Sequence, residues 1–335
     1  MSAVEVQPVQ ARRGGGVLER VRTGVVIPAY QAAGNVAAVI AGIPPQVRDI
    51  FVVDDASSDG TAAAVESLRD PRVQLLRHSA NRGVGGAMKT GYAAALEAGC
   101  DVVVKMDADG QMDPAFLPDL VRPLITGEAG YAKGNRLWSL AASRDMPRRR
   151  LLGNLLLSMA TKAVSGYWNV LDPTNGYTAV RADLLRRLDW RYVQDRYFFE
   201  TSMLVELHLL RAPVRDMLMP ARYAGETSSL RLIPAVPEFA GRLVRALFRR
   251  LLLEYVLLDI RPGTVLVALG LPMALWGAGF GAYHWYIGEV TGESSLPGTV
   301  MVAAGPFILG VQFLLHALLL DVQEVRNFAP LPPLA

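Results

Sequence analysis

Short apolar runs alternate with helical patterns from Thr23 onward. Runs of a few residues rich in valine and isoleucine predict strands, and the longer segments between them predict helices of roughly ten to fifteen residues. The expected strands are 24–27, 50–53, 73–76, 102–106 and 130–132, and the expected helices lie around 35–41, 60–68, 85–98 and 114–126. This order predicts an α/β fold in which helices cover both faces of a parallel sheet.

Two long apolar segments follow near the C-terminus. Residues 263–287 and 298–320 contain no Asp, Glu, Lys or Arg, and a helix rising about 1.5 Å per residue would cross about 30 Å of hydrocarbon in each. A buried core helix is the alternative for either segment. The loop 288–297 holds Glu289 and Glu293 and no cation. The stretch before the first segment contains Arg242, Arg245, Arg249, Arg250 and Arg261. The positive-inside rule therefore places the large N-terminal part and both termini in the cytoplasm, in an integral inner (plasma) membrane protein.

The segment 237–258 is amphipathic. Its arginines share one helical face and its leucines and Phe248 share the other, which is typical of a helix lying in the headgroup layer beside anionic lipid. A solvated face on an ordinary core helix is the alternative. We expect five parts: a disordered basic lead 1–20, an α/β domain 21–233, a juxtamembrane helix 234–261, a transmembrane hairpin 262–325 and a cytoplasmic tail 326–335.

Composition restricts the chemistry. The chain is 51% hydrophobic, more than a soluble domain needs, and its formal net charge is +3. We expect no nucleic-acid partner. Cys100 is the single cysteine, which excludes an intrachain disulfide and fits the cytoplasm. The four histidines have no ligand spacing, so we expect no zinc site. Residues 1–16 lack an apolar stretch, and we expect no cleavable signal sequence.

Two carboxylate pairs stand at the ends of predicted strands. Asp54-Asp55 ends the second strand, and Asp107-Ala108-Asp109 ends the fourth. Carboxylates at i and i+2 of an extended segment point to one side, and they repel unless a divalent cation lies between them. The second pair predicts a metal clamp for a diphosphate, with an acidic turn as the alternative. Because ligands of parallel sheets bind beyond the carboxyl ends of the strands, Pro28-Ala29-Tyr30 is expected in the same crevice.

A dinucleotide site is the rival interpretation of such a sheet. The run 83–88 resembles the G-x-G-x-x-G fingerprint, but Met88 occupies the third glycine position and the run follows the third strand. We therefore expect its glycines to permit close backbone packing beside a nucleotide, or a tight turn.

Four segments, in order and at plausible spacing, resemble one family. They are 25–30, 53–61, 81–83 and 106–111. Together they resemble the family-two glycosyltransferases of GT-A type, and within these the polyisoprenyl-phosphate glycosyltransferases akin to dolichol-phosphate mannose synthase and the bacterial enzymes that glycosylate undecaprenyl phosphate. The resemblance covers roughly residues 23–232, and in the two-span variant also the C-terminal part. It implies a GT-A (Rossmann-like) nucleotide-diphospho-sugar transferase domain.

The resemblance also implies residue roles. The expected nucleotide-binding residues are Pro28, Tyr30, Asp54, Asp55 and Asp107. The expected ligands of Mg²⁺ or Mn²⁺ are Asp107, Asp109 and Gln111. The arginines expected at the acceptor phosphate are Arg136, Arg150 and Arg222. The residues expected to act in catalysis are Asp109, Arg136 and Asp172.

The expected acceptor simplifies the chemistry. A lipid phosphate monoester has a second pKa near ~6 and is already a nucleophile at neutral pH, so no strong general base is required. Asp172 is interpreted either as a residue that orients the acceptor or takes a residual proton, or as the turn residue of an Asp-Pro pair. Glu200 is a further candidate for that role, with a buried structural carboxylate as its alternative.

We predict an inverting, metal-dependent transfer of a sugar from a UDP- or GDP-sugar to a polyisoprenyl (undecaprenyl-like) phosphate at the cytoplasmic membrane face. The alternatives are a membrane-anchored glycosyltransferase with another lipid or glycan acceptor, and a non-catalytic nucleotide-sugar-binding membrane protein or scaffold. Gly277 and Gly281 permit close contact of the first span, within the hairpin or between chains. Two-span relatives can form tetramers, so we expect a homo-oligomer, with a simple anchor as the alternative.

Overall fold

The structure, a computed structural model, describes residues 15–135, 148–173, 175–219, 232–257, 260–324 and 328–334. It divides into two compact units. The α/β unit comprises Met1–Ala246 and Phe328–Ala335, and the hairpin unit comprises Leu247–Asn327.

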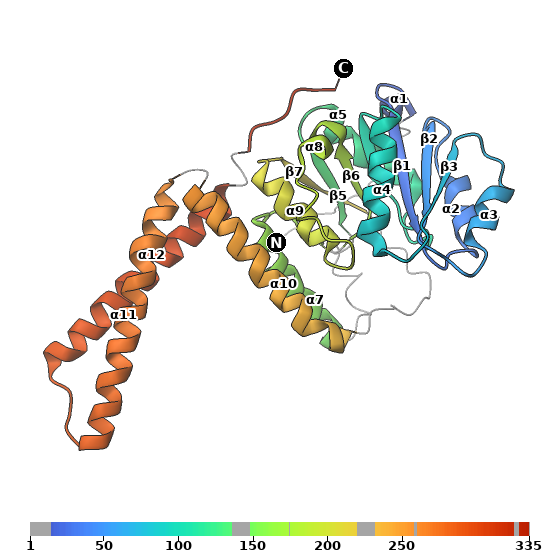
Figure 1. Cartoon of the computed structure of the whole chain (residues 1–335). Helices are drawn as coiled ribbons and strands as arrows, with labels where there is room; N and C mark the ends of the chain where they lie inside the picture. Colours follow the sequence, from blue (N-terminus) through green and yellow to red (C-terminus); the bar gives the residue numbers. More distant parts are fainter. Residues whose placement is uncertain are drawn as a thin grey trace, which may run out of the picture. The chain divides into compact units, whose positions relative to one another are not determined.

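A mixed sheet forms the centre of the α/β unit (Figure 1). Its strands are β1 (Thr23–Ala29), β2 (Asp49–Asp54), β3 (Val73–Arg77), β4 (Val102–Lys105), β5 (Tyr131–Asn135), β6 (Thr178–Arg181) and β7 (Val214–Leu218). They lie in the order β3-β2-β1-β4-β6-β5-β7. β1 to β4 are parallel, as predicted, but β6 is antiparallel to both β4 and β5. The α/β class is confirmed, and the expectation of a wholly parallel sheet is wrong beyond β4.

Helices cover both faces of this sheet. One face packs on α2 (Val36–Gly42), α3 (Thr61–Ser67) and α5 (Leu117–Ile125), which follows a 3₁₀ turn at Pro114–Phe116. The other face packs on α4 (Gly83–Glu97), which also contacts α9 (Phe199–Leu209). α7 (Arg148–Ser165) packs in turn on α9, and α8 (Ala182–Arg187) follows β6. The predicted helices 35–41, 60–68, 85–98 and 114–126 all form within a few residues of their expected bounds.

Both chain ends contribute to the α/β unit. Residues Gly15–Leu18 form α1, and Leu18 is buried in the core although it lies in the segment expected as a disordered lead. The C-terminal segment 328–334, part of the predicted cytoplasmic tail, lies against the domain. The Leu331 N–H donates to the Gly127 carbonyl at 2.8 Å, and the Phe328 ring packs edge-on against Tyr167. The chain therefore leaves this unit for the hairpin and returns to it.

The boundary between the two units falls inside α10 (Leu232–Leu252), which continues as a π-helix over Leu253–Leu257. Two helices follow, α11 (Pro262–Thr291) and α12 (Pro297–Glu324), and both are long and apolar enough to cross a bilayer. Only 11% of the most apolar stretch of each is buried. A core helix of a soluble protein would bury most of that stretch, so membrane association explains these helices better.

Glycines bring the two hairpin helices together. A Cβ on Gly277 would lie 2.6 Å from the Ala303 carbonyl oxygen, and one on Gly270 would lie 2.9 Å from the Gly310 carbonyl oxygen. A Cβ on Gly281 would lie 3.3 Å from the Ala303 Cβ. Of the two contacts expected for Gly277 and Gly281, the structure shows the one within the hairpin. The homo-oligomer stays a prediction that these glycines do not support.

A buried ion cluster joins the helices of the hairpin unit at one end. Arg250 is 2.8 Å from an Asp321 carboxylate oxygen and 3.1 Å from Glu254. Arg261 pairs with both Glu254 and Glu324. Asp321 and Glu324 follow the uncharged segment 298–320, and Arg250, Glu254 and Arg261 precede the uncharged segment 263–287. All five charges therefore lie outside the segments for which burial in hydrocarbon would be costly.

Candidate active site

The loops that follow β1 and β2 are bonded to each other at the carboxyl edge of the sheet. The Gln31 N–H donates to the Ser57 hydroxyl at 3.1 Å, and the Ala33 N–H donates to the Asp59 carboxylate at 3.0 Å. Both loops are strained, because Gln31 and Ala56 adopt positive φ angles of 54° and 60°. The serines and Asp59 of the motif at 53–61 therefore shape this edge.

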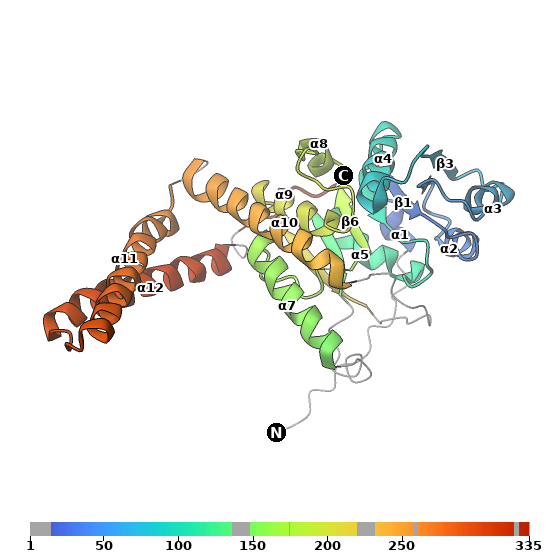
Figure 2. The ribbon, with the colours of Figure 1, turned by 60° about the horizontal axis from the view of Figure 1, so that its bottom comes forward.

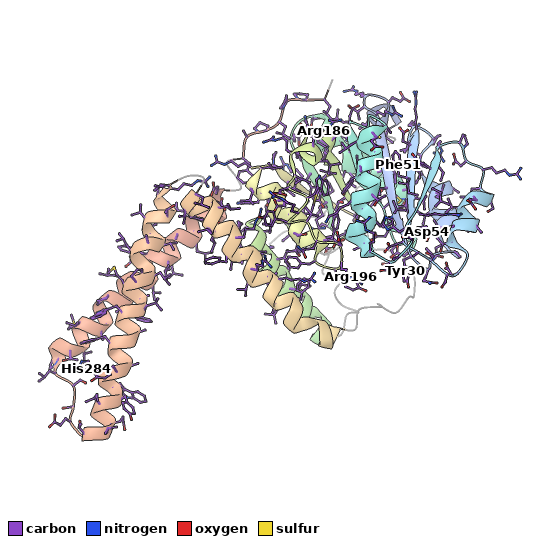
Figure 3. All side chains as sticks on the ribbon, in the orientation of Figure 1. Tyr30, Phe51, Asp54, Arg186, Arg196 and His284 are labelled. Atoms are coloured by element: carbon purple, nitrogen blue, oxygen red, sulfur yellow. The ribbon has the colours of Figure 1, made fainter. Side chains whose placement is uncertain are left out.

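Tyr30 and Asp54 lie at the same end of the sheet (Figure 3). The Tyr30 side chain is exposed, whereas Asp54 is buried and accepts a bond from the Ser57 N–H at 3.0 Å. Pro28 is half-buried beside them on β1. An exposed ring next to a buried carboxylate can take a flat base and bond its polar edge, which fits the expected nucleoside pocket.

Asp55 bonds to neighbouring protein groups through both carboxylate oxygens. One oxygen is 2.7 Å from His78 Nδ1 and accepts from the Arg82 N–H at 2.8 Å, and the other accepts from the Gly83 N–H at 2.7 Å. His78 is held on its other side by Thr90 at 2.9 Å. Asp55 therefore fixes the turn that opens α4.

The glycines at the start of α4 permit close backbone packing, and Gly83, with a φ of 82°, also lies in a turn. Packing beside a nucleotide stays a prediction. A Cβ on Gly85 would lie 2.1 Å from the Gln194 carbonyl oxygen, and one on Gly83 would lie 2.7 Å from the Asp195 carbonyl oxygen. The loop that leads to α9 thus lies directly on α4. It also brings Arg196 to the end of the sheet where Asp54 lies (Figure 3).

The motif Asp107-Ala108-Asp109 lies in a turn, not on an extended segment. β4 ends at Lys105, and Gly110 completes the turn with a φ of 77°. The Asp109 carboxylate accepts from the Gln111 N–H at 2.9 Å, which closes the turn. The prediction that Asp107 and Asp109 point to one side because they alternate along an extended strand is therefore wrong. Asp107 and Asp109 nevertheless both lie just beyond the carboxyl end of β4.

The Asp107 carboxylate pairs with a buried lysine and lies close to the backbone of Gly176. Lys105, fully buried on β4, places its ammonium 2.7 Å from one Asp107 oxygen and 3.4 Å from Glu200 of α9. Burial alone would lower the Lys105 pKa, but the carboxylates of Asp107 and Glu200 raise it. A Cβ on Gly176 would lie 2.5 Å from the second Asp107 oxygen and 2.4 Å from Lys105 Nζ. Only glycine leaves room there for both side chains.

Lys105 belongs to a polar row that crosses four adjacent strands. In the strand register Lys105 of β4 faces Thr178 of β6, Thr178 faces Lys133 of β5, and Lys133 faces Asp216 of β7. Lys133 is fully buried and donates to the Asn175 carbonyl. Burial lowers the pKa of Lys133 to about 8 and raises the pKa of Asp216 to about 6. The sheet thus carries charge beneath the turn that holds Asp107.

This burial predicts an alkaline stability effect. The folded-state pKa of Lys133 lies below that of an unfolded lysine, so the unfolded chain binds more protons between about pH 8 and pH 10. Stability should therefore rise with pH in this window, by an amount on the order of 2 kcal/mol. Thermal unfolding of the detergent-purified protein should show this rise relative to Lys133→Met, in which the buried ammonium is gone. If the stability of wild type and of Lys133→Met changed equally between about pH 8 and pH 10, the burial of a titrating Lys133 would be contradicted.

The acceptor-side residues are described only in part. Arg136 and Arg222 lie outside the described residues, and Arg150 is described only as a backbone position in α7. Asp172 is buried, and its carbonyl accepts from the Asn175 N–H at 3.3 Å, so it does take part in a turn. The Glu200 carboxylate is mostly buried beside Lys105, which agrees with the alternative interpretation of Glu200 as a buried structural carboxylate. Their roles at the acceptor stay predictions.

The residues present fit a divalent cation. Asp107, Asp109 and Gln111 offer oxygen ligands at the edge of the sheet, and the carboxylate of Asp107 is partly exposed. Among the described residues there is no group of three or more His, Cys, Asp or Glu that would enclose a metal by itself. Mg²⁺ characteristically takes one or two carboxylates and completes its shell with substrate phosphates and water. Such a site needs no more protein ligands than this turn provides.

Comparison with known proteins decides the family. The sequence model of glycosyl transferase family 2 matches residues 24–189, which contain β1 to β6 and both carboxylate motifs. An undecaprenyl-phosphate mannosyltransferase from Micrococcus luteus is 34% identical over 187 residues, which cover 54% of this chain and 76% of that protein. The chain belongs to glycosyl transferase family 2. It is therefore a glycosyltransferase, and the sequence-based family prediction is confirmed.

Two further comparisons place this family 2 glycosyltransferase. A UDP-N-acetylglucosamine–dolichyl-phosphate N-acetylglucosaminyltransferase from Methanococcus voltae is 31% identical over 188 residues, covering 52% of this chain and 74% of that protein. The crystal structure of glucosyl-3-phosphoglycerate synthase from Mycobacterium tuberculosis, in complex with Mn²⁺, UDP-glucose and phosphoglyceric acid, aligns with a TM-score of 0.53 at 21% identity. That alignment covers 73% of this chain and 85% of the other. It shows the fold, and the GT-A prediction is confirmed.

Sequence reasoning missed three residues that the structure places around the candidate site. Lys105 stood inside an apolar run, and a charged residue there was the available signal that a buried partner exists. Gly176 gave a weaker signal, as one glycine in a polar segment. Arg196 gave none, because only the loop that packs on α4 brings it to this edge.

Proposed function

We propose that this glycosyltransferase transfers one sugar from a UDP- or GDP-sugar to a polyisoprenyl phosphate at the cytoplasmic face of the membrane. The observation that carries the proposal is the presence of a carboxylate site and a membrane anchor in one chain. Asp54 ends β2, Asp107 and Asp109 lie just beyond the carboxyl end of β4, and β1 lies between these two strands. The same chain also has two bilayer-length apolar helices. The three carboxylates suit the binding of a nucleoside diphosphate with its metal ion. The two apolar helices suit a substrate that stays in the bilayer.

On the donor side, Asp54, Pro28 and Tyr30 bind the nucleoside. Asp55 acts indirectly, because its oxygens already hold the turn at Arg82 and Gly83. Asp107, Asp109 and Gln111 would hold Mg²⁺ or Mn²⁺, and the bound ion would stabilise the negative charge that develops on the departing nucleoside diphosphate. Lys105 of β4 positions Asp107 through the ion pair between its ammonium and the Asp107 carboxylate.

On the acceptor side, the names of two relatives support a lipid phosphate, since one is an undecaprenyl-phosphate and the other a dolichyl-phosphate transferase. Arg136, Arg150 and Arg222 bind the phosphate with paired donors. An acceptor phosphate oxygen attacks the anomeric carbon as the bond to the donor diphosphate breaks on the opposite side. The anomeric configuration therefore inverts. Asp172 orients the acceptor, and no proton must be removed first.

The hairpin orients this reaction. The arginines before α11 and the absence of cations in the loop 288–297 favour a cytoplasmic α/β unit. Tyr283, Trp285 and Tyr286 are exposed near the loop end of α11, as expected for an aromatic belt at a membrane interface. With the acceptor confined to the bilayer, an anchored enzyme searches for it in two dimensions.

The purified full-length enzyme in detergent tests this function. It would be incubated with a panel of radiolabelled UDP- and GDP-sugars, Mg²⁺ or Mn²⁺, and undecaprenyl phosphate, and label would be counted in the organic phase. We expect one donor to label the lipid, and only when metal is present. Parallel reactions with 3-phosphoglycerate or a glycan in place of the lipid would be counted in the aqueous phase. Label there, with none in the lipid, would favour the alternative of another acceptor.

Arg150→Ala should separate acceptor use from donor binding. Loss of a charge-assisted hydrogen bond is expected to lower kcat/KM for undecaprenyl phosphate by about 10- to 100-fold. The affinity for the nucleotide, measured by calorimetry, should stay the same. Arg186→Ala, which removes an exposed arginine from α8, is the matched control and should change neither. If Arg150→Ala weakens nucleotide binding while acceptor kinetics hold, the assignment of Arg150 is wrong.

A further inference from the structure

Glu200 shares a buried ammonium with a proposed metal ligand. Lys105 of β4 has a side chain that is only 1% exposed, and its Nζ atom lies 2.7 Å from Asp107 and 3.4 Å from Glu200. The Glu200 side chain is 17% exposed and comes from α9, a different element of the fold. Among the described residues, Glu200 forms no second ion pair. One buried positive charge therefore stands between two carboxylates.

Packing fixes Glu200 at this place. The helix α9 packs on both α4 and α7 (Figure 2). Glu200 lies in its first turn, and the two preceding residues, Phe198 and Phe199, are buried. The Ser202 hydroxyl accepts from the Gln194 N–H at 3.0 Å, which joins this turn to the loop that packs on α4. The packed helix, and not a surface loop, therefore sets the position of this carboxylate.

Lys105 has two effects on Asp107. Its ammonium positions the carboxylate, but it also offsets part of the negative charge that would attract a divalent cation. Asp107 can turn fully to a cation only if the ammonium has another anion, because a buried charge left without a partner is strongly destabilising. The Gly176 carbonyl, 3.3 Å from the Lys105 Nζ atom, is neutral and cannot replace a carboxylate. Glu200 is the anion within reach.

The second buried lysine depends less on Glu200. The charge of Glu200 also acts on Lys133 of β5, but so do the charges of Asp172 and Asp216. Among the described residues, the carboxylates that act on Lys105 are those of Asp107 and Glu200. Loss of the charge at position 200 would therefore leave Lys105 paired with Asp107 alone, whereas Lys133 would keep two acidic neighbours.

We propose that Glu200 is a positioning residue of the metal site and acts through Lys105. It is the second counter-ion of the buried ammonium, and so it leaves the Asp107 carboxylate available to a divalent cation. This inference rests on the proposed metal role of Asp107. It places Glu200 on the donor side and not at the acceptor, so its effect should be measurable with no acceptor present.

Mn²⁺ binding to the purified full-length protein in detergent tests the proposal, with UDP and GDP each added in turn. Bound Mn²⁺ is measured from the loss of the free-ion signal in electron paramagnetic resonance. Glu200→Gln, which removes the charge and keeps the size, should weaken Mn²⁺ binding by about 10- to 100-fold. The nucleotide affinity without metal should stay the same. Glu206→Gln, which changes another buried carboxylate of α9, is the matched control and should leave Mn²⁺ affinity unchanged.

A second substitution separates this role from a purely structural one. Lys105→Met added to Glu200→Gln removes the ammonium that holds Asp107, so Mn²⁺ affinity should recover even though two buried charges are lost. Sugar transfer should stay low, because Lys105 also positions Asp107. Should Glu200→Gln fold poorly, Glu200→Asp moves the carboxylate back by one methylene group. It should weaken Mn²⁺ binding less, and Lys105→Met should again restore it.

Unchanged Mn²⁺ affinity in Glu200→Gln, or no recovery when Lys105→Met is added, would overturn the role of Glu200 and leave the metal site intact. If Glu200→Gln kept its Mn²⁺ affinity but had a raised KM for undecaprenyl phosphate, Glu200 would belong to the acceptor side. Failure of wild type to bind Mn²⁺ with either nucleotide would instead contradict the proposed metal-dependent function.

Discussion

Asp109→Asn is expected to lower sugar transfer by at least about 10²-fold while leaving the fold intact. The change removes one of the two negative charges in the turn after β4 and keeps the side chain's size. The turn itself should survive, because the amide oxygen of Asn can still accept the bond from the Gln111 N–H. The loss should therefore come from the metal and not from the structure.

Binding measurements would separate these causes. Calorimetric titration of wild type with nucleoside diphosphate should show affinity that rises with Mn²⁺ and falls with chelator, and Asp109→Asn should lose that dependence. Asp113→Asn is the matched control, because Asp113 caps the following 3₁₀ turn through the Ala115 N–H and is not a proposed ligand. Full activity of Asp109→Asn in metal-free buffer would overturn the metal role.

Gly176→Ala should have a comparably large effect through packing alone. The new methyl group would lie within 2.5 Å of the Asp107 carboxylate and 2.4 Å of the Lys105 ammonium, so both side chains must move. These atoms are the ends of flexible side chains, and the backbone of Gly176 does not have a positive φ, so thermal stability should change little. Displacing Asp107 by about 1 Å is expected to lower activity by about 10²-fold.

The control for this variant is Gly34→Ala, because a Cβ on Gly34 would meet no atom within 4 Å. It should retain wild-type activity and stability. For Gly176→Ala, the informative pair of readouts is the melting temperature and the metal-dependent affinity for nucleotide. A variant that melts as wild type but loses metal dependence supports the role of Gly176. Wild-type activity in Gly176→Ala would show that Asp107 tolerates displacement.

The first half of the sheet could be predicted because its strands are local apolar runs with helices between them. β1 to β4 and their connecting helices followed from this pattern. β6 (Thr178–Arg181) was not predicted, and its antiparallel direction depends on strand pairing that sequence periodicity does not report.

The candidate site also has one part that the sequence could predict and one part that it could not. Asp54, Asp107 and Asp109 could be proposed as site residues because motif and strand end coincide in the sequence, and the structure places all three at the carboxyl edge of the sheet. The polar row beneath them could not be found, because Lys105, Lys133 and Asp216 become neighbours only through the order of β4, β6, β5 and β7.

The lipid product tests the central proposal most directly. Purified wild type would be incubated with the donor selected from the panel, Mn²⁺ and undecaprenyl phosphate, and the lipid fraction would be analysed by mass spectrometry, with Asp109→Asn run in parallel. We predict a single new lipid whose mass exceeds that of the acceptor by one sugar residue, formed by wild type and absent with Asp109→Asn. Release of free sugar and nucleoside diphosphate with an unchanged lipid mass would contradict transfer to polyisoprenyl phosphate.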